Sequence, residues 1–255
     1  MGSLKTFFSL ELRRARALVK RIYTGKHKLE ELPIALQHFL IQSGFMAVGN
    51  IHQTKIEWKS AALKFSKTGQ WKHIDCTQHN FLPDPIRLAY MKTKMFGIVG
   101  LEAFDSFRHG HGGMMIRMAQ LFNMTNAKGP EMDRAALVTI LAEVMIIPDY
   151  AVQTYIQWEE INPYTLRGTI NYHGLKASGI FYFNSNFVIE KFETTDRCYM
   201  DKKGKFHPVR WTAECSGYTR HGKISFPTTF KSTWNFPTGD LTYFHGKIDT
   251  IIINP

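Results

Sequence analysis

The stretch AALVTILAEVMIIP, from Ala135 to Pro148, decides the fold of this 255-residue chain. Its apolar residues recur at helical spacing, and the positions between them are apolar too, apart from Thr139 and Glu143. The stretch therefore predicts a helix that is buried on most sides. With 13 residues before the proline, this helix is about 20 Å long, too short to cross a bilayer. The helical stripe consists of Leu137, Ile140, Leu141, Val144 and Met145.

The segments before and after this helix alternate with a period of two, which is typical of β-strands. Clusters of glycine, proline and asparagine separate them at short intervals, so neighbouring strands are expected to pair antiparallel. Five strands are predicted before the helix, over residues 51–66, 71–81, 86–96, 98–108 and 113–122. Seven are predicted after it, over residues 154–160, 165–172, 176–183, 188–195, 207–218, 223–234 and 241–253.

A sheet of about 12 twisted strands does not stay open and flat, and it curls or closes. The apolar helix, predicted over residues 133–147 with Asp133 as its cap, suits the hollow of such a sheet. The predicted fold class is therefore α+β: a large, strongly curved antiparallel half-barrel wrapped around a short buried helix. We expect residues 29–255 to form this single domain. A short helix over 29–43 precedes the sheet, with Pro33 in its first turn and Gly44 at its C-terminal cap.

Residues 1–28 form a predicted basic arm, with eight lysines and arginines against Glu11 alone. The arm holds +7 of the net charge of +11. The rest of the chain is only mildly basic, which argues against nucleic acid as a partner. Residues 5–23 predict an amphipathic helix, and two interpretations are open: its apolar face packs on the domain, or the helix lies on an anionic membrane surface. The face consists of Phe8, Leu12, Ala15, Val19 and Ile22.

Other sequence signals bear on location. No run reaches the ~18–20 apolar residues that a membrane span needs, and the N-terminus shows no apolar core of a secretory signal. Cys76, Cys198 and Cys215 are scattered and form no CxxC pair. This predicts free thiols in a reducing compartment, with one disulfide still open. We therefore expect a cytoplasmic protein, with peripheral association at the inner membrane as the alternative.

Glu143 is the main candidate for a functional residue, because an ionised carboxylate inside an apolar helix is costly unless it is paired. One interpretation is an ion pair or hydrogen bond that fastens the helix to the sheet, with Arg197, Arg167 or a backbone amide as partner. A second is a polar anchor at the mouth of an apolar pocket, and a third is a general acid or base. We expect Arg197, at a predicted strand end, to reach a carboxylate or to bind an anionic ligand.

Aromatic residues make up 13% of the chain. Most are expected to pack in the core or at its rim. A concave sheet lined by aromatic side chains also suits a lipid or another apolar small molecule. Trp158, Trp211 and Tyr218 therefore join Glu143 and Arg197 as candidate ligand-binding residues.

A weak metal signal lies around Gly110, where His109 and His111 flank the glycine and Asp105 precedes them. A His-x-His pair needs a third ligand to hold a metal, and His-Gly-His-Gly-Gly is also typical of a hairpin turn. No phosphate-binding loop, zinc-protease motif or nucleophile elbow is present. The sequence therefore assigns no cofactor and no catalytic residue.

The second half of the chain carries a recognisable order of motifs, and it resembles a bacterial family of domains of unknown function. The resemblance runs from about residue 32 to the C-terminus. Members of that family are distantly similar to the periplasmic lipoprotein carriers (LolA-like half-barrels), which implies a curved sheet with a helix in its concavity. The motifs are Gly129-Pro130-Glu131-Met132-Asp133, Leu141-Ala142-Glu143, Pro148, Ala151, Trp158, Arg197, Trp211, Tyr218, Gly222, Pro227, Trp234 and Tyr243.

The leading functional hypothesis is non-enzymatic binding of a hydrophobic or amphiphilic, lipid-like ligand in the concavity of the sheet. One alternative is an enzyme that uses Glu143 with a nearby arginine or histidine. The other is a peripheral membrane scaffold that binds through residues 5–23.

Overall fold

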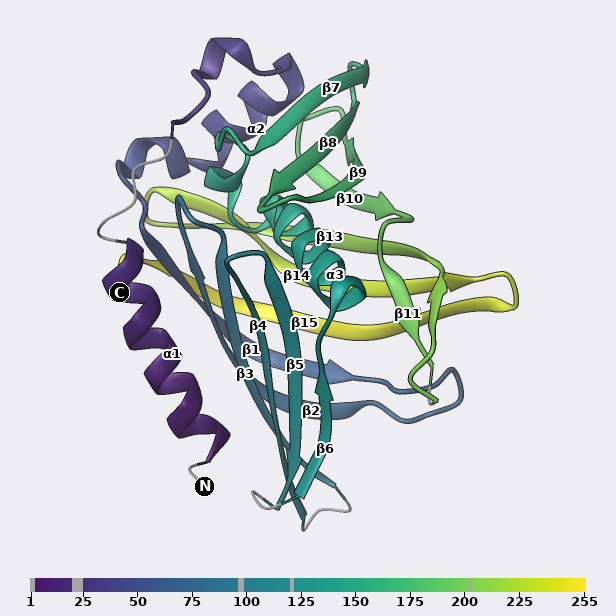
Figure 1. Ribbon diagram of the computed structural model, residues 1–255. Helices are drawn as coiled ribbons and strands as arrows, with labels where there is room; N and C mark the ends of the chain where they lie inside the picture. Colours follow the sequence, from purple (N-terminus) through teal and green to yellow (C-terminus); the bar gives the residue numbers. More distant parts are fainter. Residues whose placement is uncertain (1–2, 20–24, 96–98, 120–121, 202) are drawn as a thin grey trace.

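The computed structural model describes residues 3–19, 25–95, 99–119, 122–201 and 203–255 (Figure 1). Its helices are α1 (Leu4–Val19), α2 (Ile34–Ser43) and α3 (Pro130–Ala142), with short 3-10 helices at Leu29–Glu31, Phe45–Val48, Glu143–Met145 and Pro148–Tyr150. The strands are β1 (Gln53–Leu63), β2 (Lys72–Phe81), β3 (Ile86–Met95), β4 (Val99–Arg108), β5 (His111–Met118), β6 (Phe122–Ala127), β7 (Ile156–Asn162), β8 (Thr165–Tyr172), β9 (Leu175–Phe183), β10 (Ile189–Thr194), β11 (Cys198–Met200), β12 (Phe206–Pro208), β13 (Arg210–His221), β14 (Ile224–Phe236) and β15 (Gly239–Ile253).

The main sheet is antiparallel throughout the described residues and has 13 strands, in the order β6-β5-β4-β3-β2-β1-β15-β14-β13-β10-β9-β8-β7. The first strand pairs with the last in the middle of the sheet, and α3 connects the two edge strands β6 and β7. The predicted α+β half-barrel is confirmed, with 13 strands in place of about 12. The two halves of the chain curl toward each other around α3 (Figure 1).

Two segments differ from the predicted strands. The predicted strand 113–122 is split between β5 and β6, and Ala119 beside the break has a positive φ of 50°. A separate hairpin of β11 and β12 lies between β10 and β13, where no strand is predicted before residue 207. The Asp201 carboxylate accepts hydrogen bonds from the N–H groups of Lys203 and Lys205. Local hydrogen bonds therefore stabilise this turn. The hairpin lacks the alternating apolar pattern by which the other strands are predicted.

The buried helix α3 lies in the concavity, but its bounds differ from the prediction. It begins at Pro130 rather than Asp133, because proline is well suited to the first helical position. Asp133 does not cap the helix; its carboxylate accepts the N–H of Gly112 at 2.7 Å. The α-helix ends at Ala142 and continues as a 3-10 turn over Glu143–Met145. Pro148 disfavours helical geometry at the preceding residue, and Ile147 has φ −123° and ψ 79°.

Helix α1 covers the convex face of the sheet, on the side opposite α3 (Figure 1). Most of the predicted apolar face is buried there against β2, β3 and β4, while Leu12 is partly buried. Ile22 lies outside the described residues. The apolar face of the helix is thus occupied by the sheet. The cluster contains Leu4, Phe8, Ala15, Val19, Phe81, Ile86, Leu88, Tyr90 and Phe104.

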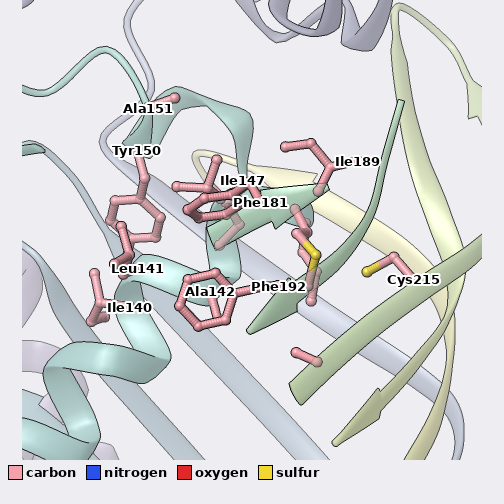
Figure 2. Packing of buried hydrophobic residues seen from close by; sticks show 14 of the residues in the cluster. Ile140, Leu141, Ala142, Ile147, Tyr150, Ala151, Phe181, Ile189, Phe192 and Cys215 are labelled. Atoms are coloured by element: carbon pink, nitrogen blue, oxygen red, sulfur yellow. The ribbon is translucent and has the colours of Figure 1, made fainter. Parts of the chain in front are cut away.

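The main core lies on the concave side, between α2, α3 and the sheet. The aromatic rings of Phe181 and Phe192 have centroids 4.8 Å apart and pack beside Leu141 (Figure 2). Helix α2 begins at Ile34, after Pro33, rather than at residue 29, because Leu29–Glu31 forms a separate 3-10 turn. Its C-terminal cap is Gly44, with a φ of 71°, as the sequence predicts. No helix of the described residues is long and apolar enough to cross a membrane.

Candidate functional site

A cavity of about 150 Å³ lies between α3 and the concave face of the sheet. Strands from both halves of the chain contribute to its wall, so the curl of the sheet creates it. The wall is mostly apolar, with a few charged and hydrogen-bonding groups. Its lining includes Trp58, Cys76, Gln78, Arg87, Ala89, Met91, Asp105, Met114, Thr139, Glu143, Arg197, Trp211 and Tyr243.

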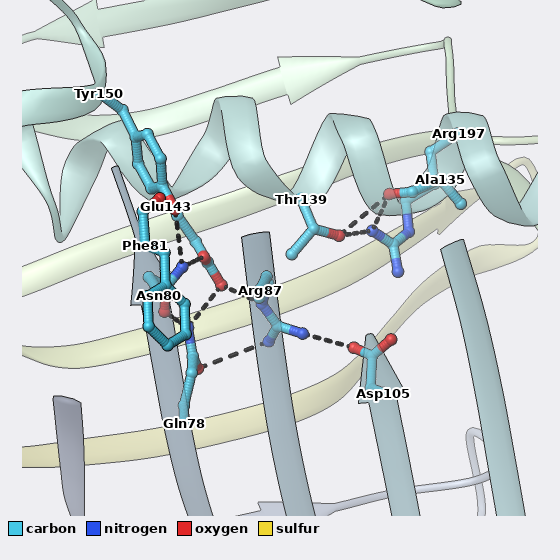
Figure 3. Close-up of polar contacts among 10 residues, drawn as sticks. All are labelled: Gln78, Asn80, Phe81, Arg87, Asp105, Ala135, Thr139, Glu143, Tyr150 and Arg197. Carbon is cyan, nitrogen blue, oxygen red and sulfur yellow. Dashed lines mark hydrogen bonds and ion pairs between the residues drawn. The ribbon is translucent and has the colours of Figure 1, made fainter. Parts of the chain in front are cut away.

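Glu143 lies in this wall with only 3% of its surface exposed. Its Oε1 accepts the Nε–H of Arg87 at 2.7 Å and the side-chain amide of Gln78 at 2.9 Å. Its Oε2 accepts the amide of Asn80 at 2.5 Å (Figure 3). Arg87 also donates from Nη1 to Asp105 at 2.6 Å. The carboxylate is therefore fastened to β2 and β3.

The structure confirms a paired Glu143 but corrects its partner. Arg167 instead pairs with Glu159 at 2.8 Å on the protein surface. Arg197 hydrogen-bonds to α3 itself, one turn or more before Glu143. The true partner, Arg87, belongs to a strand whose other face is apolar, with Ile86 and Leu88 in the cluster under α1. Because successive side chains of a strand point to opposite faces, Arg87 points to the concave face. This alternation could have identified Arg87 from the sequence.

Arg197 lies beside the middle of α3, and its expected carboxylate partner is absent from the described residues. Its Nη1 donates to the carbonyl oxygen of Ala135 at 3.0 Å and to Oγ1 of Thr139 (Figure 3). The guanidinium carbon lies 4.8 Å from the ring centroid of Trp211 and 5.8 Å from that of Trp234. The Nε–H is buried and has no acceptor among the residues that the structure describes.

The cavity thus brings together Glu143, Arg197 and Trp211, but not the other two aromatic candidates. The Trp158 indole donates to the carbonyl of Ala151 at 2.9 Å, and its ring lies tilted against that of Phe181, with centroids 5.1 Å apart. The Tyr218 hydroxyl donates to the carbonyl of Ile189 at 2.7 Å, on another part of the sheet. Trp211 lines the cavity and donates to the Tyr243 hydroxyl at 3.2 Å. The sequence did not identify Arg87, Gln78, Asn80, Trp58 or Tyr243 as residues of this site.

The three weak metal candidates have separate partners. Asp105 pairs with Arg87 in the cavity wall. His109 lies 4.0 Å from Asp84, and His111 lies 3.6 Å from Asp133. His109 and Gly110 form the β4–β5 turn with positive φ angles of 50° and 77°, as the hairpin interpretation predicts. The described residues contain no group of three or more metal-ligating side chains placed to share an ion.

Burial and charge shift the titration of the cavity groups. Burial alone lowers the pKa of Arg87, but Glu143 and Asp105 outweigh it and raise the pKa above its ordinary value. Arg87 therefore stays charged. Burial also raises the pKa of the Cys76 thiol to about 12, so this thiol is protonated at neutral pH. The pKa of Tyr150, which receives a hydrogen bond from Asn80, is likewise raised by burial.

The fold and the cavity define the class as an open antiparallel half-barrel with a helix in its concavity. The chain belongs to DUF6920, a family of unknown function whose model matches residues 30–252. The comparison with curated proteins gives no match.

Three solved structures are similar to this chain at low sequence identity. A putative outer membrane lipoprotein-sorting protein domain from Vibrio parahaemolyticus has 10% identity and a TM-score of 0.46, with 89% of this chain and 94% of that chain covered. A LolA superfamily protein from Nitrosomonas europaea has 8% identity and a TM-score of 0.46, with 86% of this chain and 94% of that chain covered. A DUF1329 family protein from Desulfovibrio piger has 8% identity and a TM-score of 0.45, with 88% of this chain and 94% of that chain covered.

Proposed function

We propose that this protein is a non-enzymatic binding protein that holds an amphiphilic, lipid-like ligand on the concave face of its sheet. The observation that carries the proposal is the cavity of about 150 Å³ under α3. Its wall combines apolar side chains with a few polar groups. This composition is typical of small-molecule sites.

The size of the cavity limits what it holds. An apolar cavity of this volume accepts a benzene-sized group, whereas pockets that enclose a whole ligand measure roughly 300–1,000 Å³. The cavity therefore takes one end of the ligand, and the remainder extends along the sheet.

The concave face next to the cavity offers an apolar surface for that remainder. Met91 and Met114 line the cavity and are partly exposed. The register pairs Ala103 with Ile116 and Leu101 with Met118, so the same face continues along β4 and β5 with partly exposed apolar side chains. Methionine is flexible and polarisable, which suits contact with alkyl chains.

Within this proposal, Glu143 positions α3 rather than performing chemistry. Both of its carboxylate oxygens accept hydrogen bonds from neighbouring side chains. A general base needs an oxygen that is free to reach a substrate proton. The contacts of Glu143 therefore support a binding protein more than an enzyme.

The test measures uptake of a fluorescent fatty-acid probe by the full-length protein, together with native mass spectrometry for lipid that co-purifies. We expect saturable binding that Ala89→Phe reduces strongly, because Ala89 lines the cavity and a larger ring fills it. Ala62→Phe is the matched control, since Ala62 is partly exposed on β1 and does not line the cavity. Thermal melts of both variants show whether each one is folded.

The absence of probe binding by the wild-type protein would refute the proposal. Binding that survives in a folded Ala89→Phe variant would place the site elsewhere and contradict the assigned cavity.

A further inference from the structure

We infer that the ligand carries an anionic group, a carboxylate or a phosphate, and that Arg197 binds this group inside the cavity. The inference rests on the proposed function and specifies the chemistry of its ligand. Three observations support it: the charges in the cavity wall, the geometry of Arg197, and the indole N–H of Trp58, which has no acceptor in the part of the chain that the structure describes.

The charged residues of the cavity wall are unequally paired. Arg87 contacts both Glu143 and Asp105, at 2.7 and 2.6 Å. Arg197 has no acidic side chain within ion-pair distance among the residues that the structure describes. A partly buried cation without a counter-charge is costly, and an anionic ligand removes that cost.

The hydrogen bonds of Arg197 leave one edge of its guanidinium available. Both acceptors from α3, the Ala135 carbonyl and the Thr139 hydroxyl, contact Nη1. In the described part of the chain neither Nε nor Nη2 has a hydrogen-bond acceptor, and Nε is buried. The Nε and Nη2 groups form a parallel pair of donors, which matches the two oxygens of a carboxylate or phosphate.

The position of Arg197 is fixed before any ligand arrives. Two acceptors on α3 hold Nη1, and the rings of Trp211 and Trp234 lie near the guanidinium, at 4.8 and 5.8 Å. A donor pair that is already oriented loses little conformational entropy on binding. Figure 3 shows Arg197 on the same side of α3 as Arg87 and Asp105.

Trp58 provides independent support. It lines the same cavity, and its buried indole N–H meets no acceptor within the described ranges of the chain. A buried donor that lacks a partner is unusual in a folded protein and costs free energy. In the described part of the chain the Trp58 indole N–H and the Arg197 Nε–H both lack an acceptor, so the cavity favours a ligand that supplies oxygens.

The experiment compares three ligands of equal chain length by calorimetric titration of the full-length protein, all below their critical micelle concentrations. They are dodecanoic acid, dodecyl phosphate and methyl dodecanoate. We expect at least one of the two anions to bind about tenfold or more tightly than the neutral ester, which is the order expected for a charge-assisted contact. The tighter anion identifies the headgroup as carboxylate or phosphate.

Three variants test whether Arg197 causes this preference. Arg197→Gln should remove most of the preference, so that the variant binds the anion and the ester with similar affinity. Arg210→Gln is the matched control, because Arg210 is exposed and does not line the cavity, yet it carries the same charge. Trp58→Phe keeps Arg197 and should weaken anion binding a few-fold, so it tests the site even if Arg197→Gln does not fold.

The outcomes separate the inference from the proposed function. Equal binding of ester and anions by the wild-type protein would overturn the inference and leave the proposed function intact. A preference that Arg210→Gln abolishes as fully as Arg197→Gln, or that Trp58→Phe leaves unchanged, would also overturn it. No binding of any of the three ligands would overturn both.

Discussion

The Nε atom of Arg87 lies 2.7 Å from the carboxylate of Glu143, so a side chain of β3 fastens the C-terminal end of α3 to the sheet. Both groups are largely buried, with side-chain exposures of 13% and 4%. Such a pair adds little net stability compared with apolar residues, but removing one partner leaves an uncompensated buried charge. The contact therefore fixes where α3 lies in the concavity.

Arg87→Met should destabilise the protein by about 3–5 kcal/mol, because it leaves the buried carboxylates of Glu143 and Asp105 without their cation. Urea unfolding measures the change. The control is Arg167→Met, which breaks the exposed pair with Glu159 and should cost no more than about 1 kcal/mol. Equal effects of the two substitutions would contradict the proposed role of Arg87.

The buried helix and its charge were predictable, but the partner of the charge was not. An apolar run that ends at a proline specifies a buried helix by local pattern alone, and turn signals specify the meander. The contact between Glu143 and Arg87 depends on the registers of β2, β3 and β4 and on the rotation of α3. Those are long-range properties, set by packing over 56 residues of separation.

Gly112 should be required where β5 meets α3. A Cβ atom at this position would lie 2.5 Å from the carbonyl oxygen of Met132 and 2.6 Å from Cβ of Ala136. Gly112→Ala should therefore destabilise the protein by about 1–3 kcal/mol, in the range of overpacking. Gly113→Ala is the neighbouring control, since its Cβ would meet nothing closer than 3.6 Å. If both variants unfold at the same urea concentration, the close approach of β5 to α3 at residue 112 does not determine the stability of the protein.

His79 should make stability depend on pH. Burial, with the positive charges of Arg16 and Lys55, lowers the pKa of His79 from 6.5 to about 4. Between these two values the unfolded chain binds a proton that the folded protein does not. Stability is therefore fully present above about pH 6.5 and falls as the pH drops toward 4. The loss is about 3 kcal/mol, at about 1.4 kcal/mol per pKa unit.

Unfolding of His79→Gln at several pH values checks this expectation. The variant should show a flatter stability profile between about pH 6.5 and 4 than the wild-type protein. His52→Gln is the control, because it makes the same substitution at an exposed histidine. If the stability of His79→Gln changes with pH as steeply as that of the wild-type protein, other groups cause the pH dependence.

The candidate site could be predicted only in part, and the reason differs between residues. Arg197 lies in the connection after β10, Trp211 is the second residue of β13, and both line the cavity. Trp158 and Tyr218 are aromatic residues with a hydrogen-bond donor, as Trp211 is. Each of them, however, donates to a backbone carbonyl outside the cavity. Composition identifies residues that suit a ligand, whereas strand register decides which of them share one cavity.

Cys76 should react slowly with alkylating reagents although it lines the cavity. Burial raises the pKa of its thiol to about 12, and the thiolate is the reactive form. Mass spectrometry after brief iodoacetamide treatment of the folded protein should find Cys198 modified well before Cys76, because the raised pKa of Cys76 keeps its thiolate scarce although both side chains are partly exposed. In urea the two thiols should react at similar rates, which controls for intrinsic reactivity. Cys76 modified as fast as Cys198 in the folded protein would show that the cavity wall opens readily, and a bound fatty acid should then slow that reaction.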